Sequence, residues 1–520
     1  MSNRKLRPNK RRSRSIIAFE MIRLDRASTE PLHQQLYRQI RDELRSGSFS
    51  EGASRLPSSR VLATELGVSR LTINFAFSKL HAEGYLRSKA KSGTFIADPL
   101  PETFLSPLEL ATARLDRGGS DIRPAVKRRP PVADRVAELR DQRVRDQLKL
   151  GRTVAGPGIS LVPSVPAVDE FPMGAWERLR AQVLARKGTH LLRYASHLGD
   201  PDLRKAIAAY LCDFRAVRCD FEQIVIAAGM QQAMLITALA VMNPGEIAWV
   251  EDPGYLQARR AFVLAGAKVV PKPLDDEGLM IMRTRRESLP KLIYIAPSHQ
   301  YPLGVTMSFE RRQTLLDFAR AHGAFVFEDD YDSEFRFVGP PLPSLQGLDD
   351  SGRVIYAGTM SKILFPSLRL GYIVAPEGLV DAMAKIRNAI DQHSSSIDQA
   401  TLARFITEGF FLSHIRRMRA IYAQRRDFFM EQFNALLRDR FTLQVPDAGL
   451  NMVAWLKRAE DFATVQRIAK NIGVGPVPLS LVSIQAKLKP AFIFGFAAWT
   501  SAQIRESLVK FASALKANGV

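Results

Sequence analysis

The chain has 520 residues, of which 46% are hydrophobic, and its 74 lysines and arginines against 53 aspartates and glutamates give a formal net charge of +21. This balance is typical of a globular protein of several domains with a polyanionic partner such as nucleic acid. Two cysteines, Cys212 and Cys219, and no long apolar run exclude a disulfide framework, a cysteine-based metal site and a membrane span, so we expect a cytoplasmic protein without a metal ion.

The first 98 residues divide into a basic tail and a small helical pattern. Residues 1–24 hold a cluster of lysines and arginines, so we expect a disordered tail that either lies along phosphates or is simply solvated. Residues 31–46 carry leucine and isoleucine at four-residue spacing, which predicts an amphipathic helix. Two shorter helices are predicted over 60–66 and 70–83, and the glycine turn at 67 makes them a helix-turn-helix pattern.

A short hairpin completes this module. Tyr85–Leu86 and Gly93–Ile96 are predicted strands joined by a basic turn, which is the pattern of a wing. The stretch LPSSRVLATELGVSRLTINFAFSKLHAEGYL, followed by SGTFIA, resembles the winged helix of the GntR family of transcription regulators and implies a DNA-binding domain over 25–98. The start of the third helix would then enter the major groove. The expected contacts to DNA are Ser58, Arg60, Ser69, Arg70, Thr72, Lys91 and Gly93.

Residues 99–166 lose this pattern, because prolines interrupt it and no apolar face is wide enough to fold alone. We interpret the stretch as a linker. Its charge either helps to hold DNA or only keeps a spacer solvated, and the sequence leaves both alternatives open.

The remaining residues, 167–520, alternate between strand and helix patterns as far as about residue 369. A strand at 223–228 followed by a helix at 230–242 begins the series. Such alternation predicts a mostly parallel α/β sheet. The large part is expected at about 195–400, and the small part from the N-terminal segment together with about 401–520, where a helical region over 379–437 leads into an α+β end over 441–520.

The stretch VIYAGTMSKILFPSLRLGY, residues 354–372, carries the side chains most suited to chemistry. A buried strand over 354–357 should break at Gly358–Ser361 and place Lys362 at its carboxyl end, where open α/β sheets bind ligands. An amine beside hydroxyls and a guanidinium suits an aldehyde cofactor with a phosphate: Lys362 condenses as a Schiff base, while Thr359, Ser361 and Arg369 hold the phosphate. Taken alone, a Ser-Lys pair in a loop is more often just a solvated surface pair.

Four further segments end an apolar strand with small or polar residues, and their joint occurrence supports the same chemistry. A pyridine cofactor needs a carboxylate at its ring nitrogen and a donor at its phenolic oxygen. Asp329 and Tyr331 are two residues apart, so an extended chain places both on one face, with Asp330 facing the other way. Tyr255 could stack on the ring, and the free amides after Gly229 favour an anion.

The motifs SHQYPLG, EDDYDSEF, TMSKILFPSLRLGY and HIRRMRAIYAQRRD, together with the winged helix, are similar to those of the MocR subfamily of GntR regulators. The resemblance implies a winged helix fused to a fold-type-I aminotransferase-like domain that binds pyridoxal 5′-phosphate, a homodimer, and at most residual transaminase activity. By motif, it assigns the Schiff base to Lys362, contact with the ring nitrogen to Asp329 and contact with the phenolic oxygen to Tyr331. Tyr255 would stack on the ring, and the phosphate would be bound by Gly229, Met230, Thr359, Ser361 and Arg369. The candidate effector or cofactor contacts are His299, Gln300 and Tyr301.

Two departures from the family concern the recognition of an effector or a substrate. Aminotransferases commonly hold the substrate carboxylate with an arginine near the segment KLKPAFIFGFAAW, but the chain has none between Arg467 and Arg505. Lys487 or Lys489 could substitute only as point charges, without the bidentate fork of arginine. In addition, Asn451 stands where related regulators often carry histidine. Both departures count against an amino-acid effector.

We therefore expect a DNA-binding transcription regulator that holds pyridoxal 5′-phosphate as a lysine aldimine and uses it as ligand or effector-sensing cofactor. Its targets would be genes of vitamin B6 or of amino-acid and amine metabolism. The alternative is an active aminotransferase with an appended DNA-binding module. Expected partners are an operator with paired half-sites, a second copy of the chain, and an amine or amino acid. The operator, the target genes and the sign of regulation stay open.

Overall fold

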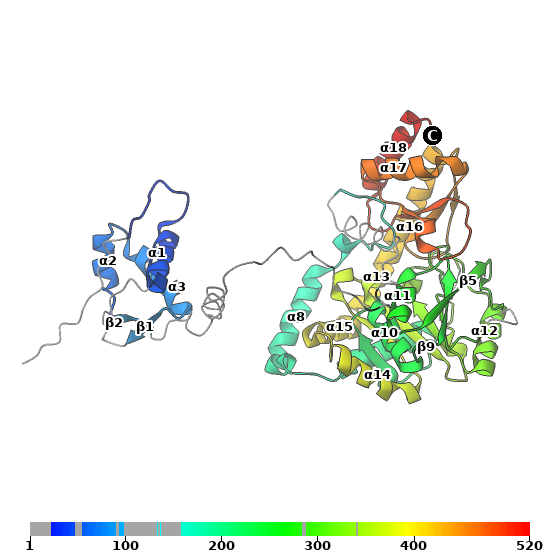
Figure 1. The fold of residues 1–520 in the computed structure, drawn as a ribbon, viewed down its shortest axis with the longest axis horizontal. Helices are drawn as coiled ribbons and strands as arrows, with labels where there is room; N and C mark the ends of the chain where they lie inside the picture. The colour runs from blue at the N-terminus through cyan, green and yellow to red at the C-terminus, as the bar shows by residue number, and fades with distance from the viewer. Residues whose placement is uncertain are drawn as a thin grey trace, which may run out of the picture. The chain divides into compact units, whose positions relative to one another are not determined.

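The computed structural model describes residues 22–46, 55–89, 93–97, 133, 136, 158–282, 288–339 and 342–520. These fall into two compact units, one within residues 1–129 and one within 130–520, and each is described by itself (Figure 1). Most of the predicted tail and linker, and Lys91 of the predicted wing, lie outside the described residues. None of the helices in the described ranges is both long enough and apolar enough to cross a membrane.

The smaller unit is a three-helix bundle closed by a two-stranded antiparallel sheet. Its core is built from apolar side chains of all three helices, among them Leu36, Ile40, Ile73 and Leu80, each 0% exposed. Ile22 also packs into this core, so the unit begins before the predicted boundary at residue 25. The elements are α1 (Leu32–Ser46), α2 (Ser59–Glu65), α3 (Arg70–Ala82), β1 (Leu86–Lys89) and β2 (Gly93–Ile96).

The hairpin of this unit is longer than predicted. Residues 87–89, expected in the turn, belong to β1 and pair with residues 93–95 of β2. The His81 ring explains the extension, because it bonds through Nδ1 to the carbonyl of Leu86 and through Nε2 to Ser88 Oγ. The strand is therefore held against α3 although residues 87–89 have polar side chains and only Leu86 packs into the core.

The larger unit contains an eight-stranded mixed sheet in the order β3-β10-β9-β8-β7-β4-β5-β6. Its centre, from β5 to β9, is parallel, as the alternation of strand and helix patterns predicts. The strands are β3 (Ile224–Ala227), β4 (Ile247–Asp252), β5 (Lys268–Asp275), β6 (Gly278–Leu279), β7 (Leu292–Ile295), β8 (Phe325–Asp330), β9 (Val354–Thr359) and β10 (Gly371–Val374).

Strand β10 was not predicted, because the expected alternation ended near residue 369. It lies antiparallel between β3 and β9, with Tyr372 opposite Gly358. A Cβ on Gly358 would come within 2.3 Å of the Tyr372 hydroxyl, so glycine is needed here for close packing. Gly358 was expected to break β9, but the strand continues through it to Thr359.

Helices cover both faces of this sheet (Figure 1). On one face α10 (Met230–Val241), α11 (Leu256–Leu264) and α14 (Glu377–Ile390) pack against small and branched residues of the central strands. The other face is covered by α8 (Met173–Lys187), α9 (Pro201–Arg215), α12 (Phe309–His322) and α15 (Ser396–Thr407).

The C-terminal part forms a second, smaller core. The 28-residue helix α16 (Phe410–Leu437) joins the two, since Phe411 packs with the large core and Phe429 with the small one. Leu161, 0% exposed, packs into the small core, and Ser160 pairs with Val474, so residues before the predicted boundary at 167 belong to this unit. The other elements are β11 (Phe441–Gln444), β12 (Asn451–Leu456), α17 (Phe462–Ile472), β13 (Val477–Pro478), β14 (Ala491–Gly495) and α18 (Ser501–Ala517).

Candidate cofactor site

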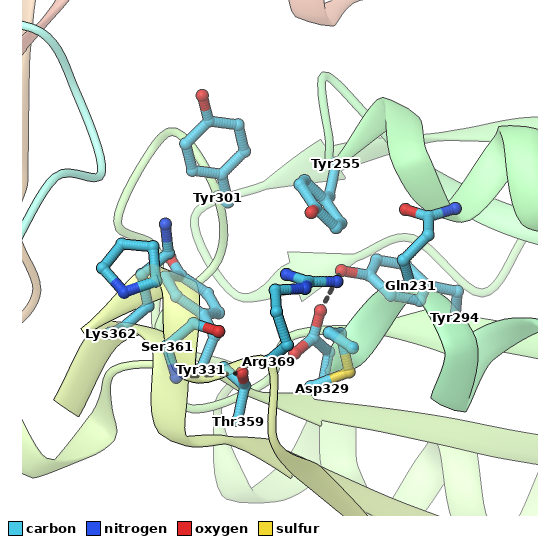
Figure 2. Close-up of a pocket in the computed structure, with 12 residues that line it drawn as sticks. Gln231, Tyr255, Tyr294, Tyr301, Asp329, Tyr331, Thr359, Ser361, Lys362 and Arg369 are labelled. Atoms are coloured by element: carbon cyan, nitrogen blue, oxygen red, sulfur yellow. Dashed lines mark hydrogen bonds between the residues drawn. The ribbon is translucent and has the colours of Figure 1, made fainter. Parts of the chain in front are cut away.

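A cavity opens at the carboxyl ends of the parallel strands β7, β8 and β9, beside the start of α10. In the view of Figure 2, Lys362 and Ser361 lie on one side of it, Gln231 and Tyr294 on the other, and Arg369 and Asp329 between them. The lining residues are Met230, Gln231, Tyr255, Tyr294, Tyr301, Asp329, Tyr331, Thr359, Ser361, Lys362, Pro366 and Arg369. The structure thus brings together eight of the nine side chains or backbone positions predicted for cofactor binding.

The ninth predicted position, Gly229, precedes the helix that borders the cavity. Its φ of 88° suits glycine, and a Cβ here would lie 3.2 Å from Arg369 Nη2. Arg369 itself donates from Nη2 to the carbonyl of Ala228 at 2.9 Å. The absence of a side chain at Gly229 therefore lets the guanidinium lie against the N-terminus of α10, where free amides attract an anion.

Asp329 has a carboxylate with two different environments. Tyr294 Oη donates to Oδ2 at 2.6 Å, as the dashed line in Figure 2 marks. Oδ1 is buried and has no hydrogen-bond partner among the residues that the structure describes. Burial raises the pKa of this carboxyl to about 7, and the nearby carboxylates of Asp330 and Asp332 add to the rise.

Asp330, the next residue, points to the opposite face of the sheet. There it accepts from Arg215 Nε and Nη2 at 3.0 and 2.8 Å and from the hydroxyl of Tyr356. The charge of Arg215 lowers the pKa of Asp330 despite its burial. The alternation expected from the sequence therefore separates a structural carboxylate from the one in the cavity.

Lys362 is held by a segment almost two hundred positions earlier in the chain. Its Nζ donates to the carbonyl of Ser164 at 2.6 Å. Asn451 in turn fixes Ser164, because its Oδ1 accepts from the Ser164 amide at 2.5 Å and its Nδ2 donates to Ser164 Oγ at 3.1 Å. Burial lowers the pKa of the Lys362 amine, whereas the charges of Asp332 and Asp329 oppose that change.

The two hydroxyls near Lys362 differ in their bonding. Thr359 Oγ1 accepts from the Ser361 amide at 3.2 Å and so caps the short helix α13 (Met360–Ile363). Ser361 Oγ is buried and makes no hydrogen bond within the described part of the chain. A hydroxyl in this position can donate to an anion in the cavity.

The three candidate effector contacts lie in different places. Tyr301 lines the cavity, and its ring meets that of Tyr255 edge-on at 6.2 Å. His299 does not line it but stands behind Tyr331, with Nδ1 at 3.1 Å from the Tyr331 hydroxyl and at 2.9 Å from Asp332 Oδ1. Gln300 is 1% exposed and donates to the carbonyl of Pro253 at 2.9 Å, so it stabilises the turn that follows β4.

These observations fit pyridoxal 5′-phosphate. Two buried polar atoms of the cavity lack partners within the described ranges: Asp329 Oδ1, which could accept from a pyridine nitrogen, and Ser361 Oγ, which could donate to a phosphate. Lys362 supplies an amine whose pKa burial lowers, which favours the nucleophilic neutral form. The donor set thus matches the two polar ends and the aldehyde of the cofactor.

Sequence reasoning missed several residues of the site. Tyr294 and Gln231 line the cavity, but Tyr294 sits within an apolar strand and only the pairing of β7 with β8 brings it to Asp329. Ser164 lies in the predicted linker and carries no signal of its role. Pro366 follows Lys362 in the quoted motif and was not singled out.

The lysines considered as substitutes for a substrate-binding arginine lie elsewhere. Lys487 and Lys489 line a separate pocket with Phe462 and Ser480. The basic residues among those that line the cavity are Lys362 and Arg369. In the described ranges, no three histidine, cysteine or acidic side chains are grouped so as to hold a metal ion.

The predicted DNA contacts are placed on the smaller unit. Ser58 Oγ and Ser69 Oγ accept from the amides of Val61 (3.3 Å) and Thr72 (3.1 Å), so both serines are N-caps. The Ser69 and Thr72 hydroxyls are also 2.9 Å apart. Arg60, Arg70 and Gly93 are exposed; a Cβ on Gly93 would lie 3.2 Å from Arg55 Nε.

Comparisons with known proteins match both units. Residues 169–510 match the family "Aminotransferase class I and II", and residues 32–96 match "Bacterial regulatory proteins, gntR family". The probable rhizopine catabolism regulatory protein MocR of Rhizobium meliloti is 38% identical over 96% of each chain. The pyridoxine biosynthesis transcriptional regulator PdxR of Corynebacterium glutamicum is 30% identical over 85% of this chain and 86% of its own.

A solved structure extends the likeness to the fold of the larger unit. Kynurenine aminotransferase of Pyrococcus horikoshii, crystallised in complex with PMP, has a TM-score of 0.67 and 28% identity to this chain. The match covers 74% of this chain and 97% of the aminotransferase. The aminotransferase fold is therefore complete in the larger unit.

Proposed function

The chain belongs to the MocR subfamily of the gntR regulators, in which a winged helix is joined to a class I and II aminotransferase domain, and we propose that pyridoxal 5′-phosphate held at Lys362 controls its binding to DNA. The proposal rests on two buried atoms of the cavity, Asp329 Oδ1 and Ser361 Oγ, that have no hydrogen-bond partner among the described residues. One could accept from the ring nitrogen and the other could donate to the phosphate of the same ligand. In a transcription regulator, binding of that ligand in the cavity can act as the signal that changes the affinity for DNA.

Each polar end of the cofactor has matching residues. When bound, the cofactor supplies an aldehyde that bonds to an amine and a ring that withdraws electrons. Asp329 Oδ1 would accept from the ring nitrogen, and Tyr331 Oη, which lies beside His299 Nδ1, would donate to the phenolic oxygen. Arg369, Ser361 Oγ and the amides at the start of α10 would hold the phosphate, while Tyr255 would cover the ring.

The charges of the cavity favour a sensor over an efficient aminotransferase. Lys362 and Arg369 are both assigned to the cofactor, which leaves no further basic side chain, among the described residues lining the cavity, for a substrate carboxylate. Catalysis of transamination requires that the substrate be oriented at the reacting carbon. Without such a contact, an amino acid would bind weakly and turn over slowly.

The runner-up is an active aminotransferase with an appended DNA-binding unit. The complete constellation around Lys362, and the 28% identity to an aminotransferase over most of the larger unit, favour it. Multiple turnovers with candidate amino acids would distinguish it, because a sensor should show at most a single, slow half-reaction.

The contact between Lys362 and Ser164 offers a route from the cavity to the winged helix. Ser164 belongs to the segment 158–166, which enters the larger unit from the connector to the smaller one. A Lys362 Nζ joined covalently to an aldehyde ligand would carry at most one hydrogen, and the phenolic oxygen of that ligand would compete with the Ser164 carbonyl for it. Occupancy of the cavity would therefore loosen the Ser164 end of this segment, and a two-state segment biased by ligand is the physical basis of a switch.

The relatives support the choice of target genes and of the assembly. One is named for rhizopine catabolism and another for pyridoxine biosynthesis, so we propose genes of vitamin B6 or amine metabolism as targets. Paired operator half-sites would be contacted by a homodimer, since helix-turn-helix proteins match the symmetry of their sites.

Footprinting and gel-shift titration of the full chain on DNA upstream of its own gene test the proposal. We expect a protected region with sequence-selective binding whose affinity changes when pyridoxal 5′-phosphate is added. Lack of selective binding in both states would contradict a regulator. Selective binding that ignores the cofactor would contradict only the sensing role.

A further inference from the structure

The exposed face of α3 carries large apolar side chains, which contacts with DNA phosphates do not require. Leu71 and Phe75 are 64% and 56% exposed, although both are large hydrophobic side chains. They are four residues apart, so they lie next to each other on one helix face. The buried residues Ile73, Ala76, Phe77 and Leu80 define the opposite face. A single exposed apolar side chain needs no explanation, but two large ones side by side on this helix do.

The polar side chains near this face are largely occupied within the unit. The Ser69 and Thr72 hydroxyls are engaged in the N-cap of α3. Lys79 Nζ lies over the ring of Tyr37, 4.1 Å from its centroid. Among the described residues of α3, this leaves Arg70, Asn74 and Ser78 as exposed polar side chains beside the two apolar ones.

Phe75 is also held in place by a neighbouring helix. The ring of His33, at the start of α1, lies 5.7 Å from the ring of Phe75. A side chain fixed by a ring contact loses less conformational entropy when it packs against a ligand. Phe75 is therefore suited to contact a rigid surface outside the unit.

The winged helix is a DNA-binding domain by family, and the first turns of its third helix enter the major groove. In that groove thymine is distinguished from the other bases by its C5-methyl group, which apolar side chains contact. We infer that Leu71 and Phe75 read thymine methyl groups, so that each operator half-site carries thymines where α3 docks. This inference rests on the proposed function, because it names the DNA that the regulator prefers.

The test uses the full chain and duplexes selected from a random-sequence library. The best-bound duplex is resynthesised with deoxyuridine in place of one thymine at a time, which removes a methyl group and leaves the hydrogen-bonding edge unchanged. We expect binding about four-fold weaker at each contacted thymine, which corresponds to the ~0.8 kcal/mol of burying one methyl-sized group.

Two variants assign the methyl groups to side chains. Leu71→Ala and Phe75→Ala should each abolish the deoxyuridine effect at one thymine while the other thymines keep theirs, as in a double-mutant cycle. The matched control is Phe309→Ala on the larger unit, where the phenylalanine is 59% exposed and the deoxyuridine effects should persist. Thermal unfolding should change little in all three, since more than half of each side chain is exposed, with the largest shift in Phe75→Ala, which loses the ring contact with His33.

The outcomes separate this inference from the proposed function. Selected sites without thymines, or tight selective binding that deoxyuridine leaves unchanged at every position, would overturn the inference and leave the regulator intact. If no sequence is enriched from the library, both the inference and the proposed DNA binding fail.

Discussion

Lys362 and Asp329 have different roles in the cavity: Lys362 supplies a nucleophilic amine, and Asp329 supplies a buried carboxyl group. Lys362 is half-buried and its amine donates to a backbone carbonyl, and no carboxylate in the described part of the chain forms a salt bridge with it. Asp329 keeps one oxygen bound to Tyr294 and the other without a partner in the described part of the chain. A ligand with one ring N–H would supply the missing hydrogen bond to the second oxygen.

Lys362→Ala should abolish covalent attachment of pyridoxal 5′-phosphate, because the other cavity side chains lack a primary amine. Borohydride reduction of the loaded protein, followed by peptide mass spectrometry, should find the label on the peptide that contains Lys362 in the parent chain and on no peptide in the variant. Lys487→Ala, outside the cavity, is the matched control and should label normally. A label on another lysine of the parent would reassign the attachment.

Asp329→Asn should alter the pH dependence of stability. The raised pKa means that the folded protein holds a proton that the unfolded chain releases, so the contribution of Asp329 to stability is present below about pH 4 and is lost as pH rises to about 7. Relative to the variant, the cofactor-free parent should lose roughly 2–3 kcal/mol of unfolding free energy between about pH 5 and pH 8. Urea unfolding at both values measures this difference.

The comparison with the asparagine variant isolates this carboxyl. Glu328, whose pKa burial raises to about 7, titrates in both proteins and cancels. Glu251, whose pKa burial raises to about 8, also feels the charge of Asp329, so its titration cancels only in part. Added pyridoxal 5′-phosphate should reduce the loss in the parent, since the ionised carboxylate gains a partner. A parent and variant with parallel pH profiles would contradict the assignment of Asp329.

At the scale of elements, the strands and helices were predictable where the local pattern is strong. The long amphipathic α1 and the buried β8 follow directly from hydrophobic periodicity. Strand β10 has four residues, and its antiparallel position is set by packing between β3 and β9, which no local pattern encodes. The same limit hid Tyr294, whose role depends on the register of two strands.

The segment 158–166 shows most clearly that contacts between distant parts of the chain could not be predicted from the sequence. Its sequence is typical of a linker, yet Leu161 is buried and Ser164 lies between Asn451 and Lys362. These contacts join positions separated by 198 and 287 residues, so only the folded chain shows them. Asn451, noted in the sequence as a departure from related regulators, acquires a physical role here.

Asn451→Ala should weaken the coupling between the cavity and DNA. The variant loses both hydrogen bonds to Ser164, so Ser164 is less firmly fixed whether or not the cavity is filled, while Ser160 and Leu161 keep their contacts with the small core. We expect affinity for pyridoxal 5′-phosphate to change by less than about three-fold, a coupling below roughly 0.7 kcal/mol, while the cofactor-dependent change in DNA affinity is lost. Asn451→Asp, which keeps an acceptor for the Ser164 amide, should retain part of that change. An unaltered response in Asn451→Ala would rule out this route.

At the scale of the whole molecule, the chain forms two compact units, each with its own core. The net charge of +21 favours DNA as the partner but says nothing of a cofactor, and the aminotransferase fold favours the cofactor but not DNA. Regulation requires that the two activities be coupled by a free energy, which in allosteric proteins is typically about 1–3 kcal/mol.

The most direct test of the account is the affinity of the full chain for its selected DNA site, measured with and without pyridoxal 5′-phosphate, for the parent and for Lys362→Ala. The account predicts that the cofactor changes the dissociation constant of the parent by roughly 5- to 150-fold and leaves that of the variant unchanged. Equal affinities with and without the cofactor in the parent, or an equal change in both proteins, would contradict control of DNA binding through Lys362.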